Sequence, residues 1–230
     1  ECFFSFKKYW DIKLVKQIAT FSVWNFLTAI TSLFSAQGIG LVLNHFYGTV
    51  LNAAQGIANQ LNGQMSAFST NMMKALNPVI VKNAGAKDLD GMNVVTIAGC
   101  KYSTYLTMLF AVPFIIEVSF ILKIWLEEVP EWTTLFCILQ VIQTIICQMA
   151  NSASTAVYAQ GDIKGYAIYK SMMNALPVLL AYISLQLGGA PYWIYIPMII
   201  VWAIGGNIVI IAYSKAKCGL LIKDYWKGVI

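Results

Sequence analysis

Six long apolar runs, separated by short polar stretches, occupy most of this chain and leave few folds open to it. A helix needs about 20 mostly apolar residues to cross the hydrocarbon layer of a membrane, which is roughly 30 Å thick. Hydrophobic residues make up 59% of the 230 residues and charged residues only 11%, too little polar surface to cover a water-soluble domain. The sequence therefore predicts an all-α, polytopic membrane protein with a bundle of six transmembrane helices.

The breaks between the runs set the expected bounds of each part. We expect a juxtamembrane connection at 1–18, a six-helix membrane region at 19–214 and an amphipathic tail at 215–230 on the membrane surface. The expected spans lie near 19–43, 51–77, 99–122, 132–157, 166–187 and 192–214. The chain starts at Glu1 without a signal-peptide pattern, so we expect it to begin within a longer protein.

Lysine alone sets the charge asymmetry of the chain, which has no arginine. Lysines cluster before the first span, between the second and third, between the fourth and fifth, and after the sixth; Lys164 and Lys170 are assigned to the connection between the fourth and fifth. The alternate connections are neutral or acidic. Because lysine-rich loops stay in the cytoplasm, both ends of the chain are expected there.

The second expected span is unusually polar. Six polar side chains recur in it at spacings of three and four and fall on one helical face: Asn52, Gln55, Asn59, Asn62, Ser66 and Ser69. An unpaired amide in hydrocarbon costs several kcal/mol, so this stripe needs water or hydrogen-bonding neighbours. The stripe predicts a water-lined cavity, with hydrogen bonding between helices as the alternative.

Polar residues also recur at helical spacing in the first and fourth expected spans. They include Asn25 and Gln37 in the first, and Gln140, Gln148 and Asn151 in the fourth. Three helices with polar faces predict a hydrophilic space near the middle of the membrane, as a transporter of polar cargo requires.

Few charged residues fall within the apolar runs. Glu117 could couple transport to an ion, or it could reach water at the outer surface. Lys74 could contact a phosphate, or its side chain could extend to the inner surface. The single His45, the dispersed acids and five scattered cysteines predict no metal site, no cofactor, no nucleic-acid partner and no enzyme.

Four strings lie in order along the chain: GLVLNHFYGTVLNAAQGIANQLN (40–62), LNPVIVKNAGAKD (76–88), ILKIWLEEVPEW (121–132) and YAQGDIKGY (158–166). Together they resemble the carboxy-terminal half of bacterial polysaccharide-biosynthesis flippases. That family belongs to the superfamily that includes the multidrug and toxic compound extrusion transporters.

The resemblance implies one six-helix lobe of a two-lobe exporter, facing an amino-terminal lobe of the same protein that is missing here. The implied function is to flip a lipid-linked oligosaccharide across the bacterial inner membrane, by alternating access, for lipopolysaccharide or capsule biosynthesis. Members of the family often use basic cavity residues to meet the pyrophosphate of this lipid. In this chain only Lys74 or Lys101 lies near the membrane for that role.

Two alternatives remain open. A cation-coupled multidrug antiporter of the same superfamily would share the fold but would favour acidic and aromatic cavity residues, and only Glu117 fits. A truncated, inactive half-transporter would leave its polar faces exposed to lipid.

Overall fold

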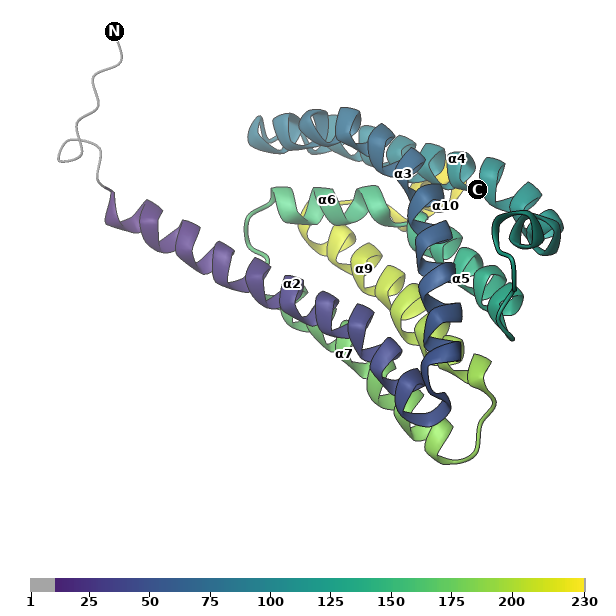
Figure 1. Ribbon diagram of the computed structural model, residues 1–230. Helices are drawn as coiled ribbons and strands as arrows, with labels where there is room; N and C mark the ends of the chain where they lie inside the picture. The colour runs from purple at the N-terminus through teal and green to yellow at the C-terminus, as the bar shows by residue number, and fades with distance from the viewer. Residues whose placement is uncertain (1–10, 230) are drawn as a thin grey trace, which may run out of the picture.

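The computed structural model describes residues 11–229, and within that range every regular element is a helix and there is no strand (Figure 1). The long helices are α2 (Ile12–Tyr47), α3 (Thr49–Gly85), α4 (Leu89–Trp125), α5 (Thr133–Gln148), α6 (Asn151–Ala159) and α7 (Lys164–Gln186). A composite helix follows, made of η1 (Pro191–Ile194), α8 (Tyr195–Pro197), the π-helical η2 (Met198–Gly205) and α9 (Gly206–Cys218). The short α10 (Ile222–Val229) ends the fold. The prediction of an all-α fold is confirmed.

Among the described residues, four helical segments are long and apolar enough to cross a membrane, namely Ile12–Tyr47, Leu89–Trp125, Lys164–Gln186 and Pro191–Cys218. A fifth is added if α5 and α6, which meet at an angle of 43°, form one bent span. The predicted span 51–77 lies within α3, which has 37 residues but is not apolar enough to join them. Residues 11–229 thus carry the helices of a membrane protein, while the sixth span remains a prediction.

Several helices extend beyond the predicted spans. The first begins at Ile12, because the Asp11 carboxylate caps it by accepting hydrogen bonds from the backbone N–H groups of Lys13 and Leu14. Part of the predicted connection at 1–18 is therefore continuous with α2, and residues 1–10 of it lie outside the described range. Asp88 caps α4 in the same way, by accepting from the N–H of Gly91 at 2.9 Å.

Two glycines permit close packing around α2. Gly48, between α2 and α3, has φ 75° and ψ −166°, a conformation that is essentially restricted to glycine. This residue allows α3 to begin immediately after α2 ends. At Gly38, an added Cβ would lie 2.9 Å from Cγ1 of Val178, so glycine lets α2 approach α7 closely.

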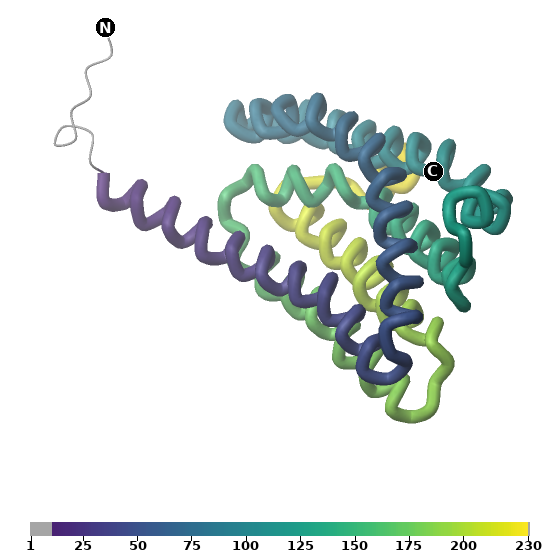
Figure 2. The backbone as a smooth tube through the Cα atoms, viewed as in Figure 1, coloured from purple at the N-terminus to yellow at the C-terminus, as the bar shows by residue number. Residues whose placement is uncertain are grey.

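The long helices form two pairs with the remaining helices between them (Figure 1). One pair is α2 with α7 and the other is the α3–α4 hairpin, while α5, α6 and α9 lie between the pairs. Figure 2 shows α3 bending along its course. The start of α2, the α3–α4 turn and the α6–α7 connection gather at one end of the molecule, and the α2–α3 turn lies at the other. Several lysines of the predicted cytoplasmic side therefore share one end.

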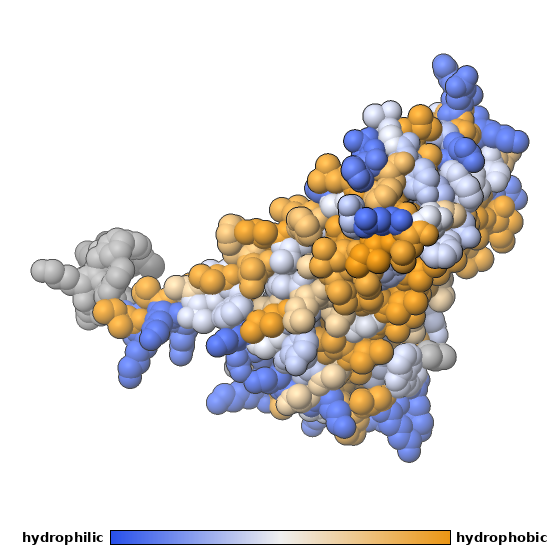
Figure 3. All heavy atoms as spheres, turned by 90° about the horizontal axis from the view of Figure 1, so that it is seen from below, coloured by the Kyte–Doolittle hydropathy of each residue, from blue (hydrophilic) through white to orange (hydrophobic). Residues whose placement is uncertain are grey.

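The outer surfaces of α2, α4 and α7 are apolar. Large hydrophobic side chains are exposed along all three, including Val23, Phe26, Leu33, Leu109, Val112, Ile116, Phe120, Met172, Leu179 and Ile183. In Figure 3, hydrophobic residues cover the middle of the face seen from below, and hydrophilic residues gather at its margins. Such a belt suits contact with lipid.

The predicted surface tail packs on the bundle through α10. Tyr225 is fully buried, and its hydroxyl donates to the backbone oxygen of Met149 at 2.5 Å. Burial raises the pKa of this hydroxyl, so it remains a proton donor at neutral pH. The tail is thus anchored by protein contacts in addition to any contact with lipid.

We predict that Tyr225→Ala lowers the free energy of unfolding by about 3 kcal/mol, because it empties a buried aromatic site and leaves a carbonyl unpaired. Thermal unfolding in detergent measures the loss. The exposed neighbour Trp226 provides the matched control, since Trp226→Ala removes similar bulk from the same helix. Equal losses for the two variants would show that the tail is not anchored through Tyr225.

Candidate functional site

The exposed side of α3 differs from that of the other long helices. Its exposed residues between 52 and 74 are small or polar, and we name them the α3 polar face: Asn52, Ala53, Gly56, Asn59, Gln60, Gly63, Gln64, Ala67, Thr70, Asn71 and Lys74. Within that range the only large apolar side chain exposed is Phe68, which stacks on Phe110 with ring centroids 4.1 Å apart. Lipid would leave these amides unpaired, so this face requires water or another polar surface.

The predicted polar stripe of α3 runs along the border between the buried side of the helix and this exposed face. Asn52 and Asn59 are exposed and belong to the α3 polar face, whereas Gln55 is only 4% exposed. Asn62 and Ser66 are half-buried. The structure therefore divides the stripe between two environments.

The buried and half-buried members of the stripe bind neighbouring helices. The Tyr195 hydroxyl donates to Oε1 of Gln55 at 2.7 Å, and Nε2 of Gln55 donates to Oδ1 of Asn59 at 3.2 Å. Thr144 of α5 donates to Oδ1 of Asn62 at 2.7 Å. Ser69 is hydrogen-bonded to Thr107 of α4. These contacts correspond to the alternative role considered for the stripe, hydrogen bonding between helices.

We predict that Gln55→Leu destabilises the fold by about 1–3 kcal/mol, because the buried Tyr195 hydroxyl loses its partner. Adding Tyr195→Phe removes the orphaned hydroxyl, so the double variant should be more stable than the sum of the two single losses indicates. Thermal unfolding of all four proteins completes the cycle. Strictly additive losses would mean that the two side chains do not interact.

The predicted cavity residues on α2 are exposed, whereas those on α5 are buried. Asn25 and Gln37 are exposed on α2 and do not line either cavity described below. Gln140 is buried, and its Oε1 has no hydrogen-bond partner among the described residues. Gln148 is also buried, and its Oε1 accepts from Nδ2 of Asn151 at 2.9 Å.

A cavity of about 270 Å³ lies between the α2–α7 pair and the helices α5, α6 and α9, and we name it the inner cavity. Residues from α2, α5, α6, α7, η2 and α9 line it: Ser32, Cys147, Asn151, Ser154, Tyr166, Lys170, Met173, Asn174, Trp202, Gly206, Asn207, Val209 and Ile210. Of the predicted cavity residues, Asn151 is in this set. Three asparagines, two serines and one lysine place polar groups in a lining that is otherwise mostly apolar.

Lys170 gives the inner cavity its positive charge. Its ammonium nitrogen lies 5.3 Å from the ring centroid of Tyr158 and 5.6 Å from that of Tyr166, within the range of cation–π contacts. The Tyr166 hydroxyl is buried and has no hydrogen-bond partner in the described part of the chain. No carboxylate is present among the lining residues to neutralise the lysine. The inner cavity is therefore suited to an anion or to a polar group rich in hydrogen-bond acceptors.

The π-helical segment η2 shapes one wall of the inner cavity. Its wider turns end at Gly205, and α9 continues from Gly206. Trp202 from η2 and Asn207 from α9 both line the space, and Nδ2 of Asn207 donates to the backbone oxygen of Ile146 at 2.5 Å. π-Helical segments within α-helices are rare and occur frequently at functional sites.

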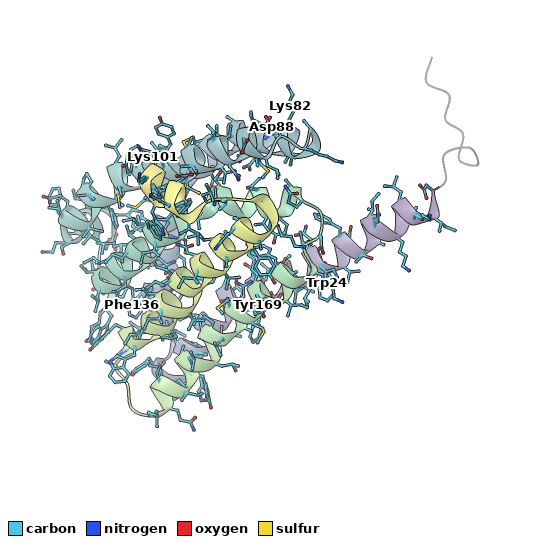
Figure 4. The ribbon with its side chains drawn as sticks, turned by 180° about the vertical axis from the view of Figure 1, so that it is seen from behind. Trp24, Lys82, Asp88, Lys101, Phe136 and Tyr169 are labelled. Atoms are coloured by element: carbon cyan, nitrogen blue, oxygen red, sulfur yellow. The ribbon has the colours of Figure 1, made fainter. Side chains whose placement is uncertain are left out.

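The predicted charged residues do not meet in this cavity. Glu117 is exposed on α4 beside the exposed Ile116 and is not part of the inner cavity. Lys74 is exposed on α3 and donates to Oδ1 of Asn71 at 3.0 Å. Lys101, labelled in Figure 4, is half-buried on α4, with its ammonium 5.7 Å from the Tyr105 ring centroid. Both lysines lie on the α3–α4 hairpin, away from Lys170 on α7.

The assignment of Lys170 to a connection was wrong, because this residue lies inside α7 and faces the inner cavity. The sequence contains a pattern that predicts a helical position for Lys170. Tyr166, Lys170 and Asn174 repeat every four residues, which places their side chains on one face of a helix.

Within residues 11–229, no cluster of three or more histidine, cysteine, aspartate or glutamate side chains could hold a metal ion. The buried polar side chains described above are instead amides and hydroxyls.

Comparison with known proteins identifies no relative. No protein family, curated protein or solved structure matches this chain. The resemblance to flippases therefore stays a prediction, and the side chains themselves must carry a functional interpretation.

Proposed function

We propose that this chain forms one lobe of a membrane transporter that moves a lipid-linked oligosaccharide across the bilayer for surface polysaccharide assembly. The observation that carries the proposal is the α3 polar face on a helix between two candidate spans, α2 and α4. An exposed row of amides at membrane depth is stable only where it borders water or a polar partner. In this proposal, α3 crosses the membrane as the sixth span and its polar face borders the passage.

The chemistry of this face fits a sugar. Asparagine and glutamine side chains each carry both donors and acceptors, so they can pair with hydroxyl groups that point either way. They do so without the desolvation cost of a fixed charge. Glycine and alanine between them, at Gly56, Gly63 and Ala67, leave room for a bulky and hydrated cargo.

Lys170 supplies the positive charge that a phosphate-bearing carrier lipid requires. In this proposal its ammonium meets the phosphate. The side-chain amides of Asn151, Asn174 and Asn207 each donate one N–H within the protein, so the second N–H of each is the donor offered to the phosphate. The lysine role that the sequence suggested for Lys74 or Lys101 is thus assigned here to Lys170. An organic cation would be repelled by this lysine, and no carboxylate lines the cavity to attract it.

The second lobe belongs to the same proposal. The α3 polar face is open over most of its length, so a facing lobe would complete the passage and remove these amides from lipid. The four strings that resemble flippases, and the lysines that share one end of the molecule, support a lobe whose two ends lie in the cytoplasm.

Reconstitution of the complete transporter in liposomes tests the function. A fluorescent lipid-linked oligosaccharide is placed in both leaflets, and a membrane-impermeant quencher reports the fraction exposed outside over time. Protein-dependent transfer between leaflets is expected for the glycosylated lipid and not for the same carrier lipid without its sugar. Transfer of a cationic dye instead would support the antiporter alternative and contradict the proposal.

A further inference from the structure

A second cavity lies at the lysine-rich end of the molecule, outside the proposed passage. It has a volume of about 830 Å³ and opens between the first turns of α2 and the connection from α6 to α7. We name it the basic groove, and its lining residues include Lys13, Lys16, Phe21, Trp24, Asp162 and Lys164. Figure 4 labels Trp24 where α2 passes close to α7.

The charge of the basic groove is positive. Lys13 and Lys16 come from α2, and Lys164 comes from the start of α7. Its carboxylate, Asp162, is already paired, because Oδ2 of Asp162 lies 2.6 Å from the ammonium nitrogen of Lys217. The three lining lysines therefore favour an anionic group.

The groove becomes apolar along α2. The spacing of Lys13, Gln17, Phe21 and Trp24 places them on one face of the helix, so the lining changes from ammonium to amide to aromatic within about three turns. The ammonium of Lys164 lies 5.7 Å from the Trp24 ring centroid and joins the two regions. A ligand that fills the groove must have a charged end followed by an apolar one.

The lysines that the basic groove takes from α2 lie at the depth of a lipid headgroup. Exposed apolar side chains of α2 begin among the lysines, at Ile12, Leu14 and Ile18, and continue into the apolar surface at Val23, which is 63% exposed. Lys13 and Lys16 precede Val23 by roughly 10 to 15 Å along the axis. The headgroup layer is roughly 5 to 8 Å thick, and a lysine side chain can bridge the remaining distance.

We propose that the basic groove binds one anionic phospholipid from the surrounding membrane. The lipid phosphate contacts Lys13, Lys16 and Lys164, and an acyl chain lies along Phe21 and Trp24. This site is separate from the inner cavity and does not depend on the identity of the transported cargo. A free phosphate would match only the lysines and would leave the aromatic part of the groove unfilled.

Quenching of Trp24 fluorescence tests the site. The chain is reconstituted in phosphatidylcholine vesicles that contain a small fraction of lipid with brominated acyl chains, either phosphatidylglycerol or phosphatidylcholine. Trp24→Phe is measured in parallel, so that subtraction isolates Trp24 from the other tryptophans. We expect brominated phosphatidylglycerol to quench Trp24 at least about fivefold more effectively than brominated phosphatidylcholine, the ratio that a single lysine near the surface supplies.

The lysines are tested by two triple variants of equal charge. Lys13→Gln, Lys16→Gln and Lys164→Gln together should abolish the preference for phosphatidylglycerol. Lys82→Gln, Lys87→Gln and Lys223→Gln lie outside the groove and should retain it. Equal loss in both variants, or equal quenching by both lipids, would overturn the proposal.

Two further outcomes address other occupants of the groove. Displacement of the brominated lipid by millimolar inorganic phosphate would show that the lysines bind phosphate alone, and it would overturn the lipid assignment. Absence of quenching by either lipid would show that protein fills the groove. Retained quenching in excess phosphate supports a bound lipid.

Discussion

Gln60→Leu combined with Gln64→Leu is expected to reduce transport of the lipid-linked oligosaccharide by at least about tenfold while the protein stays folded in the membrane. Both side chains are exposed on the α3 polar face. Leucine at these positions removes hydrogen bonds to the sugar and presents hydrocarbon to a hydrated passage. The initial rate of transfer between leaflets, normalised to folded protein, measures the effect.

The control for this variant lies on the lipid-exposed side of α4. Val112 is 51% exposed there, and Val112→Leu adds apolar bulk to a surface that is already apolar. Transport should be unchanged in the control. If the two α3 substitutions instead raised thermal stability and left transport intact, the α3 polar face would be a lipid-exposed surface without a role in transport.

Lys170→Gln is expected to weaken binding of a phosphate-bearing lipid by roughly 100-fold, because hydrogen bonds to charged groups contribute about 1.5–3 kcal/mol each. The variant keeps a polar side chain between Tyr158 and Tyr166 and should fold. Binding is measured by titrating detergent-solubilised protein with the carrier lipid diphosphate. Lys170→Arg retains the charge and should preserve most of the affinity.

A substitution of an exposed lysine separates the loss of the Lys170 contact from the loss of one positive charge. Lys215 is exposed on α9 and does not line the inner cavity, so Lys215→Gln should leave affinity unchanged. Unchanged affinity in Lys170→Gln would remove this lysine from the proposed site. Equal losses in Lys170→Gln and Lys215→Gln would indicate a general effect of charge.

The apolar runs allowed most of the fold to be predicted. The predicted spans near 19–43 and 99–122 lie inside α2 and α4, and the span near 166–187 lies within one residue of the end of α7, because a run of about 20 apolar residues is strongly helical at membrane depth. The helix ends were less predictable. Side-chain caps such as Asp11 and Asp88 extend helices through polar residues that hydropathy assigns to connections.

The division of the α3 stripe could not be predicted from one helix. Spacing shows that Gln55 and Asn59 share a face, but only the position of Tyr195, far along the chain, makes Gln55 a buried packing residue. The same limit applies to Lys170, since the inner cavity forms where α7 meets α6, η2 and α9. The π-helical turns of η2 have no distinct sequence pattern beyond Gly205 and Gly206.

The most direct test of the central claim, that the α3 polar face borders water, is cysteine accessibility in membranes. Single cysteines replace Asn59, Gln60 and Gln64 in a background without the five native cysteines, and Val112 provides the lipid-exposed comparison. A water-soluble, membrane-impermeant maleimide should label all three α3 positions and leave Val112→Cys unlabelled. Protection of all three α3 positions would contradict the account, because these amides would then face neither water nor a hydrated passage.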